Sequence, residues 1–386
     1  MNYHFLEEEN IDSPSLIYYQ DIIEENINKA IGLAGNAQRL WPHMKTHKTS
    51  ALLKMQIEKG INRFKCATIA EAELCAMANA ADALIAYPLV GPAIGRFVKL
   101  RKKYGKTTFW AMGDNLRQLG LLGKAVKAES DTPVDTLIDV NIGMNRTGVL
   151  PEDLEEFYFN AIKIEGLCIK GFHCYDGHLG IKDLDERRAA ADSASKIFWE
   201  AKKSLEKKGC VFPVLIMGGT PTFACHRETE GVFLSPGTFF VQDYGYSSKF
   251  ADLDFTPGAA ILSRVISHPA KDLFTLDTGS KAIATDPADR GIIADFPNAK
   301  PVLQSEEHWV WKLENPNESS NGGSAKTLND GSTPAGNVLP PIGTIVYIIP
   351  THICPTSALY PCIVAVKNGK LLEYWEVGAR NRKITV

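Results

Sequence analysis

The sequence has neither a surplus of positive charge nor a long apolar run. Its 386 residues include 42 lysines and arginines against 45 aspartates and glutamates, for a formal net charge of -3. Without a basic block, nucleic acid and anionic membranes are poor candidates as partners. No apolar run approaches the roughly 20 residues that a membrane span needs, and residues 1–9 lack the apolar core of a signal peptide. We therefore expect a cytoplasmic protein that binds neither nucleic acid nor membranes.

Cysteine pairs and a glycine-rich nucleotide turn are also missing. The 8 cysteines are scattered, and no two of them form a Cys-x-x-Cys pair. This pattern favours the reduced thiols of a cytoplasmic enzyme over a disulfide scaffold. No Gly-x-Gly-x-x-Gly turn follows the first apolar strand, so a dinucleotide-binding interpretation lacks its usual support. The fold must therefore be inferred from the periodic patterns.

Strand-like and helical patterns alternate through the first two thirds of the chain. The strand-like segments are 15–19, 40–46, 63–67, 83–89, 107–113, 136–143, 166–176 and 213–219. Most of them precede an amphipathic helical pattern, such as residues 49–59, 115–127 and 183–207. About eight such units in roughly 240 residues predict a parallel (β/α)8 TIM-type barrel over residues 15–252. A doubly wound open sheet gives the same alternation, and the number of units favours the barrel.

The pattern changes to β after about residue 255. Residues 259–268 and 273–277 alternate like strands, and no long amphipathic helix follows them. Asn368-Gly369 separates two further strand-like runs, and this dipeptide suits a type I′ hairpin turn. Residues 253–386, together with 1–14, are therefore predicted to form a mostly β domain. The Asn-, Ser-, Gly- and Pro-rich residues 314–337 are expected to be a loop of this domain.

A lysine in the run Leu-Trp-Pro-His-Met-Lys-Thr-His-Lys, residues 40–48, is the first candidate for chemistry. A lysine at the end of a barrel strand is placed to form a Schiff base, although for Lys45 and Lys48 taken alone solvated charges are the favoured interpretation. The run resembles the pyridoxal-phosphate lysine motif of the D-threonine aldolase and D-serine dehydratase family. In that family the lysine of Pro-His-x-Lys-x-His-Lys carries the cofactor, which implies that Lys45 carries it here.

Two loops are candidates for the phosphate of such a cofactor. Gly218-Gly219-Thr220-Pro221-Thr222 follows the last predicted barrel strand. Glycine lets backbone N–H groups approach a phosphate, and the hydroxyl of Thr220 adds a donor. Ser235-Pro236-Gly237-Thr238 also resembles a family segment and would complete the phosphate site. The candidates are Gly219, Thr220, Gly237 and Thr238.

Three further residues come from segments after the sixth and seventh predicted strands. Residues 139–148 resemble the family's Asp-x-x-x-Gly-x-x-Arg-x-Gly segment, which implies that Arg146 bonds the oxygen of the cofactor ring. The family has a cofactor-contacting tyrosine in the position of Tyr175. His178, in the loop beyond it, is a candidate general base, although a loop histidine is more often structural or solvated.

His352 and Cys354 are the candidate metal ligands. On an extended segment residues i and i+2 share a face, so imidazole and thiolate can meet one ion. A buried His and Cys pair without metal is the alternative. The segment resembles the family's His-x-Cys metal site, which implies a divalent ion, Zn or Mn/Mg, with positions left for substrate or water.

The resemblance also implies an overall fold and a reaction. The family is fold-type III, like alanine racemase, with a barrel followed by a β domain, and is usually dimeric. It implies a lyase for small D-β-hydroxy-amino acids. Retro-aldol cleavage to glycine and an aldehyde is expected first, and dehydration of D-serine to pyruvate and ammonia second. An amino-acid racemase and a non-catalytic pyridoxal-phosphate-binding protein are further alternatives.

Overall fold

The computed structural model describes residues 2–314 and 338–386, which form two compact units. The barrel unit comprises residues 24–240, 248–255 and 376–386. The β unit comprises residues 2–23, 241–247, 256–314 and 338–375. Except for residue 314, the loop expected at 314–337 lies outside the described residues. No helix in the described ranges is long and apolar enough to cross a membrane.

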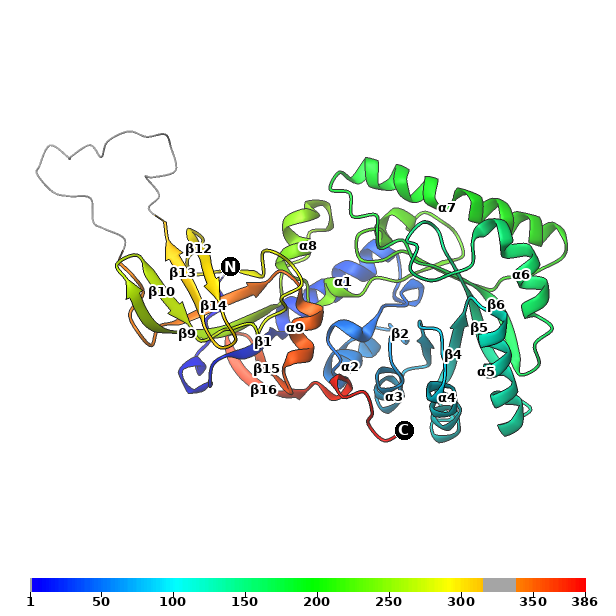
Figure 1. Cartoon of the computed structure of the whole chain (residues 1–386), viewed down its shortest axis with the longest axis horizontal. Helices are drawn as coiled ribbons and strands as arrows, with labels where there is room; N and C mark the ends of the chain where they lie inside the picture. The colour runs from blue at the N-terminus through cyan, green and yellow to red at the C-terminus, as the bar shows by residue number, and fades with distance from the viewer. Residues whose placement is uncertain (1, 315–337) are drawn as a thin grey trace, which may run out of the picture. The chain divides into compact units, whose positions relative to one another are not determined.

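The barrel unit is built on a parallel sheet with helices beside it (Figure 1). In the described part of the chain, its seven named strands are hydrogen-bonded in the order β2-β3-β4-β5-β6-β7-β8. Leu40 bridges Leu234 in β8 and His43 bridges Lys65 in β2, so residues 40–43 close the ring. Eight parallel segments therefore form the predicted (β/α)8 barrel. The named strands are β2 (Arg63–Cys66), β3 (Asp82–Ile85), β4 (Thr108–Gly113), β5 (Val134–Val140), β6 (Leu167–Cys174), β7 (Val214–Met217) and β8 (Val232–Leu234).

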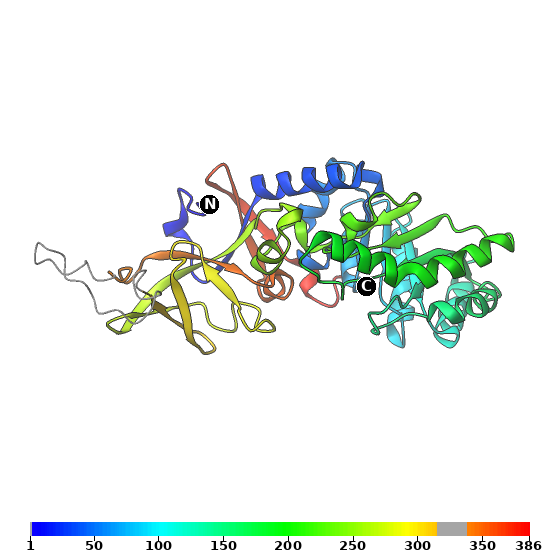
Figure 2. The ribbon, with the colours of Figure 1, turned by 90° about the horizontal axis from the view of Figure 1, so that it is seen from above.

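Capping residues define where several of the surrounding helices begin. The side chains of Thr49, Thr68, Asn115 and Asp183 accept hydrogen bonds from the first-turn amides of α2, α3, α5 and α7. Each bond satisfies an amide that the helix itself leaves without a partner. Figure 2 shows α7 as the long green helix of this unit. The helices that lie wholly or partly in this unit are α1 (Gln20–Ala34), α2 (Ser50–Glu58), α3 (Ile69–Met77), α4 (Pro92–Lys103), α5 (Leu116–Glu129), α6 (Leu154–Ala161), α7 (Leu184–Lys207) and α8 (Tyr244–Lys249).

Aromatic and aliphatic side chains fill the interior of the barrel. Trp41 is 1% exposed and packs edge-to-face against Trp110, with 5.4 Å between ring centroids. Leu84, Met112 and Ile216 belong to the same cluster. Burying one tryptophan contributes on the order of 5 kcal/mol before the entropy of ordering it. The barrel interior is therefore mostly a packed apolar core.

Strand β1 (Ser15–Tyr19), predicted to open the barrel, belongs instead to the sheet of the β unit. It pairs antiparallel with β9 and parallel with β15. Its Leu-Ile-Tyr-Tyr run is buried on both faces, and such a run has the same pattern in either kind of sheet. The eighth strand of the barrel is instead β8, whose three residues are too few for periodicity to reveal. The segment predicted as the eighth strand, residues 213–219, is the seventh.

The β unit is a mixed sheet that confirms the mostly β tail. Among the described residues its main path is β12-β13-β10-β9-β1-β15-β16, with β14 joining β9 to β11. The β15–β16 turn has positive φ at both Asn368 (52°) and Gly369 (68°), as a type I′ hairpin requires. Its elements beyond β1 are β9 (Ala259–Ala270), β10 (Leu273–Leu276), β11 (Gly291–Ile293), β12 (Ala299–Gln304), β13 (Trp309–Leu313), β14 (Ile345–Pro350), α9 (Ile353–Leu359), β15 (Cys362–Lys367) and β16 (Lys370–Glu376).

Candidate functional site

The candidate cofactor residues lie at the carboxyl ends of the barrel strands. Lys45 follows the closing segment 40–43, Arg146 follows β5, and Tyr175 follows β6. The loop 218–222 follows β7 and the loop 235–238 follows β8. The carboxyl ends of parallel strands share one end of a barrel, and that end carries the chemistry in barrel enzymes. The loops after strands seven and eight are the usual phosphate position there, so the corrected strand count suits both loops.

Lys45 is held in a short 3-10 turn, Met44–Thr46, that His43 caps. The backbone N–H of Lys45 donates to Nδ1 of His43 over 3.3 Å. Burial, followed by the charges of Lys45 and Lys65, lowers the pKa of His43 well below its usual value. A neutral imidazole can accept this bond on Nδ1, so the environment and the hydrogen bond agree. Three residues later, Lys48 pairs with the buried carboxylate of Glu71, which anchors the end of the segment.

The two candidate phosphate loops are joined through Thr220. Its Oγ1 accepts from the backbone N–H groups of Gly237 (3.2 Å) and Thr238 (3.1 Å). A Cβ on Gly237 would lie 3.2 Å from Cβ of His43, and one on Gly219 would lie 2.8 Å from the ring of Tyr175. A side chain at Gly219 would therefore clash with the Tyr175 ring, and one at Gly237 would crowd His43. The four residues proposed for the phosphate thus form a single tightly packed cup.

Ser235, in the same cup, has a buried hydroxyl that lacks a hydrogen-bond partner in the described structure. Its side chain is only 2% exposed. A buried polar atom without a partner is costly and calls for a further acceptor or donor. A phosphate oxygen would supply that partner, so the residues fit the phosphate of pyridoxal phosphate.

Arg146 and Tyr175 are in contact, as the resemblance implies for neighbours of one ring. Cζ of Arg146 lies 4.8 Å from the centroid of the Tyr175 ring. The Arg146 loop is shaped by Asn141, whose Oδ1 accepts from the amides of Gly143 and Asn145. A cation placed over an aromatic face is held by the ring quadrupole. The contact therefore fixes the guanidinium at the barrel end.

A buried polar chain beneath this pair was not foreseen from the sequence. Nζ of Lys65 lies 3.1 Å from Nε2 of His173, and Nδ1 of His173 lies 2.7 Å from Oδ1 of Asp139. Oγ1 of Thr147 donates to the other oxygen of Asp139 over 2.6 Å. Burial lowers the pKa of Lys65 to about 7. The available clue was a lysine in the middle of Arg-Phe-Lys-Cys, a short strand that is otherwise buried.

His178, the candidate base, is exposed in the loop after β6. It faces the Arg146 loop, since a Cβ on Gly143 would lie 3.2 Å from its Nε2.

A buried pair beside the loop after β7 was not predicted from the sequence. Nε2 of His226 lies 2.7 Å from Oδ2 of Asp176. Thr222 donates to the same carboxylate, so this pair supports the loop after β7.

His352 and Cys354 stand at the start of α9, so the extended conformation predicted for them is wrong. His352 is the last extended residue, and Cys354 lies in the first helical turn. The two side chains nevertheless interact. The pKa of His352 is raised to about 9. A hydrogen bond with Cys354 raises it most, burial lowers it, and the neighbouring Asp286 raises it further. Nδ1 of His352 lies 2.6 Å from Oδ2 of Asp286.

This arrangement fits an ion held by few protein ligands. A carboxylate on one imidazole nitrogen orients the ring and leaves the other nitrogen as a ligand. A thiol beside it supplies a second soft donor. Among the described residues, no group of three or more His, Cys, Asp or Glu side chains is arranged to hold a metal. His352 and Cys354 are thus neighbouring imidazole and thiol donors, which are ligand types that bind a divalent ion.

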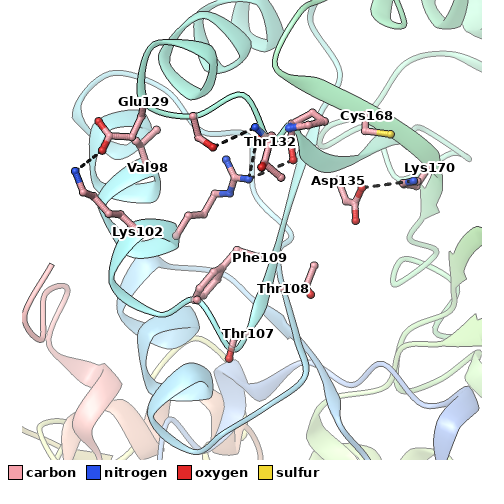
Figure 3. A pocket seen from close by; sticks show the side chains of 14 residues that line it. Val98, Lys102, Thr107, Thr108, Phe109, Glu129, Thr132, Asp135, Cys168 and Lys170 are labelled. Atoms are coloured by element: carbon pink, nitrogen blue, oxygen red, sulfur yellow. Dashed lines mark hydrogen bonds and ion pairs between the residues drawn. The ribbon is translucent and has the colours of Figure 1, made fainter.

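A separate hollow of about 640 Å³ lies at the amino ends of β4, β5 and β6 (Figure 3). Among its charged side chains, Lys102 pairs with Glu129 at 2.6 Å and Lys170 with Asp135 at 3.7 Å, while Arg101 donates to backbone carbonyls of the same hollow. In a parallel barrel this end is remote from the loops that carry chemistry. The hollow is therefore distinct from the candidate site.

Two family profiles together match most of the chain. "Alanine racemase, N-terminal domain" matches residues 20–244, and "Putative serine dehydratase domain" matches residues 258–366. The first match covers more than half of the chain and includes Lys45, Arg146 and Tyr175. The second includes both candidate metal ligands. The two matches lie in series, in the order of the barrel and the β tail.

Characterised relatives match the chain over nearly its full length. The chain is 25% identical to a D-threonine aldolase of Arthrobacter sp over 381 residues, covering 96% of this chain and 93% of the relative. It is 24% identical to a D-serine dehydratase of Dictyostelium discoideum, covering 93% and 94%. A solved D-threonine aldolase from Filomicrobium marinum superposes with a TM-score of 0.84 at 26% identity, covering 96% of both chains. From the two profile matches and these relatives we conclude that the chain is a lyase of the D-threonine aldolase and D-serine dehydratase family, the fold-type III pyridoxal-phosphate enzymes with an alanine racemase N-terminal domain.

Proposed function

We propose that this lyase cleaves D-β-hydroxy-amino acids to glycine and an aldehyde, as a D-threonine aldolase does. The observation that carries the proposal is the likeness, over 96% of both chains, to the solved D-threonine aldolase. The cup of Thr220, Gly237 and Thr238, the buried Ser235 hydroxyl and the Arg146–Tyr175 contact support a cofactor at this barrel end.

We propose a division of labour among the barrel residues. Lys45 would hold the cofactor through its side-chain amine. Thr220 and Ser235 bind the phosphate, while Arg146 holds the ring oxygen in its ionised form. Pyridoxal phosphate, when bound, supplies an electron sink for the bond broken at Cα. His178 accepts the proton of the substrate hydroxyl as Cα–Cβ breaks.

We propose that His352 and Cys354 would hold a divalent ion, which would supply Lewis-acid chemistry toward a substrate hydroxyl. Asp286 orients the imidazole by accepting from its Nδ1. Imidazole and thiolate suit zinc better than manganese or magnesium, which prefer oxygen ligands. Metal analysis of the purified protein should therefore find zinc, and the variant His352→Ala should lose it.

Dehydration of D-serine to pyruvate and ammonia is the second candidate. The match of residues 258–366 to the serine dehydratase profile, which spans His352 and Cys354, favours it. In this reaction Lys45 would remove the Cα proton, and the ion would help the hydroxyl to leave. The same residues serve both reactions, so the products must decide between them.

The decisive assay supplies D-threonine, D-phenylserine and D-serine in turn, with and without divalent metal. Glycine from the first two supports the aldolase, whereas pyruvate from D-serine supports the dehydratase. If none of the three substrates yields glycine or pyruvate, both proposals are overturned. The variant Lys45→Ala should lose the visible absorbance band and the product together. Lys54→Ala, on the exposed face of the next helix, should retain both.

A homodimer is proposed from the family alone. Sedimentation of the purified protein should give about twice the 42.4 kDa of one chain. A monomer at micromolar concentration would contradict this proposal without affecting the proposed reaction.

A further inference from the structure

A relay of hydrogen bonds joins Asp176, just beyond β6, to the loop after β7. Oγ1 of Thr222 donates to Oδ1 of Asp176 and accepts from the backbone N–H of Gly219 over 3.0 Å. Nε2 of His226 lies 2.7 Å from Oδ2 of the same carboxylate. Asp176 and Thr222 are 0% exposed, and His226 is 4% exposed. Both oxygens of a buried carboxylate are therefore held by side chains of the loop after β7.

Stability alone is a poor reason for this relay. Taking a carboxylate out of water is expensive, and its hydrogen bonds often do no more than offset that cost. An apolar contact would join the two segments with less loss. A carboxylate with two bound oxygens instead fixes direction, because each oxygen defines where one donor must lie. The relay therefore favours a role in positioning.

The relay connects two parts of the candidate cofactor site. Asp176 directly follows Tyr175, which is expected to contact the cofactor ring. Thr222 stands two residues after Thr220, whose Oγ1 accepts from two backbone amides of the loop after β8. Gly219 packs against the ring of Tyr175, since a Cβ there would lie 2.8 Å from it. The relay thus holds the phosphate cup beside the strand end that carries the expected ring contact.

We infer that Asp176 is a positioning residue that sets the spacing between the ring contact at Tyr175 and the phosphate cup around Thr220. A short linker joins the ring and the phosphate of pyridoxal phosphate, so a protein binds both ends well only when its own groups stand at the matching spacing. The relay thereby gives the protein a preference for the phosphorylated cofactor over the unphosphorylated one. The inference rests on the proposed cofactor site.

The test compares pyridoxal phosphate with pyridoxal, which has the same ring and aldehyde but no phosphate. Absorbance titration of the full-length protein, stripped of cofactor, gives a Kd for each ligand. The Kd of pyridoxal divided by that of pyridoxal phosphate measures what the phosphate contributes. Thr222→Val keeps the shape of the side chain but removes its hydroxyl, so the relay is broken. We expect this ratio to fall about tenfold, the usual cost of one hydrogen bond to a charged group.

Three further variants guard the interpretation. Asp176→Ala breaks the relay from its other side and should lower the ratio to the same extent, so the test stands even if Thr222→Val fails to fold. Thr222→Ser restores the hydroxyl and should keep the wild-type ratio. Thr136→Val removes another fully buried hydroxyl, which donates to the carbonyl of Val134 within β5 over 3.0 Å. It controls for a general loss of stability and should leave the ratio unchanged.

A ratio within about twofold of wild type in both Thr222→Val and Asp176→Ala would overturn the inference, whatever the stability of the two variants. An equal drop in Thr136→Val would do the same, because any buried hydroxyl would then have the effect. Failure of the proposed function has a different signature, since the wild-type protein would then give no visible band with pyridoxal phosphate. Asp176 would in that case have no cofactor to position, and the inference would fall with the proposed function.

Discussion

Oδ2 of Asp286 lies 2.6 Å from Nδ1 of His352, although 66 residues separate them in the chain. The carboxylate holds the proton on Nδ1 and leaves Nε2 as the nitrogen that can bind an ion. The interaction therefore links a loop after β10 to the first residue of the candidate metal site, and it gives that site an orientation that two ligands alone would lack.

Replacing Asp286 by asparagine should weaken metal binding without abolishing it. Loss of such a supporting carboxylate typically costs 10- to 100-fold in metal affinity. Competition with a chromogenic zinc chelator measures the affinity of each protein directly. Asp272→Asn, which breaks a surface pair with Lys312, is the matched control and should leave the affinity unchanged. Equal affinities of Asp286→Asn and wild type would contradict the orienting role.

Arg146→Met should weaken binding of pyridoxal phosphate by roughly 10- to 100-fold, the usual cost of one hydrogen bond to a charged group. The guanidinium over Tyr175 is expected to meet the ring oxygen of the cofactor, and methionine keeps the apolar length without the charge. Absorbance titration at constant pH gives the Kd. Arg117→Met, on the exposed face of α5, should bind as wild type does. If both variants bind equally well, Arg146 lies away from the ring oxygen.

Glu71→Ala should destabilise the protein by about 3–5 kcal/mol, the cost of leaving one partner of a buried ion pair alone. Its carboxylate pairs with Lys48 and accepts from the amide of Ala67 over 2.6 Å. The residue is 0% exposed. Urea unfolding measures the change. Glu58→Ala, exposed at the end of α2, should stay within about 0.5 kcal/mol. A small effect of Glu71→Ala would show that Lys48 finds water or another partner.

The stability gain of Lys65→Met over wild type should depend on pH. The pKa of Lys65 is lowered from 10.5 to about 7, chiefly by burial. Between these values the unfolded chain holds a proton that the folded protein has released, so wild-type stability rises with pH through this window. Methionine removes that dependence. The variant should gain on the order of 1–4 kcal/mol at pH 7, and the gain should shrink toward pH 10.

Urea unfolding of the two proteins at pH 7, 8.5 and 10 gives the difference at each pH. Lys54→Met is the reference for the effect of removing an exposed lysine. A difference between Lys65→Met and wild type that is constant across the three pH values would show that the folded-state pKa of Lys65 is ordinary.

Local signals in the sequence were enough to predict most of the barrel helices. The segments 49–59, 115–127 and 183–207 correspond to α2, α5 and α7, because Thr49, Asn115 and Asp183 mark their starts. Strand membership was harder to predict. Periodicity records which faces of β1 are buried but not which strands bury them, so this strand was assigned to the wrong sheet.

The same reasoning separates the site residues that were predicted from those that were missed. Lys45, Arg146 and Tyr175 stand in contiguous motifs whose resemblance is visible in the sequence. Lys65 and Asp286 act through partners 108 and 66 residues away. Their contacts form only when strands and loops that are distant in sequence fold together. Local sequence patterns do not predict such contacts.

The position of β1 between β9 and β15 has a consequence for synthesis on the ribosome. This strand is translated before both of its neighbours, which begin at residues 259 and 362. Residues 24–240 supply every strand of the barrel ring. A nascent chain of roughly 260 residues can therefore complete the ring while β1 still lacks its sheet partners. A strand translated before the ring is thus among the last to reach its final neighbours, and its apolar residues have no sheet partner until residues 259–270 have been synthesised.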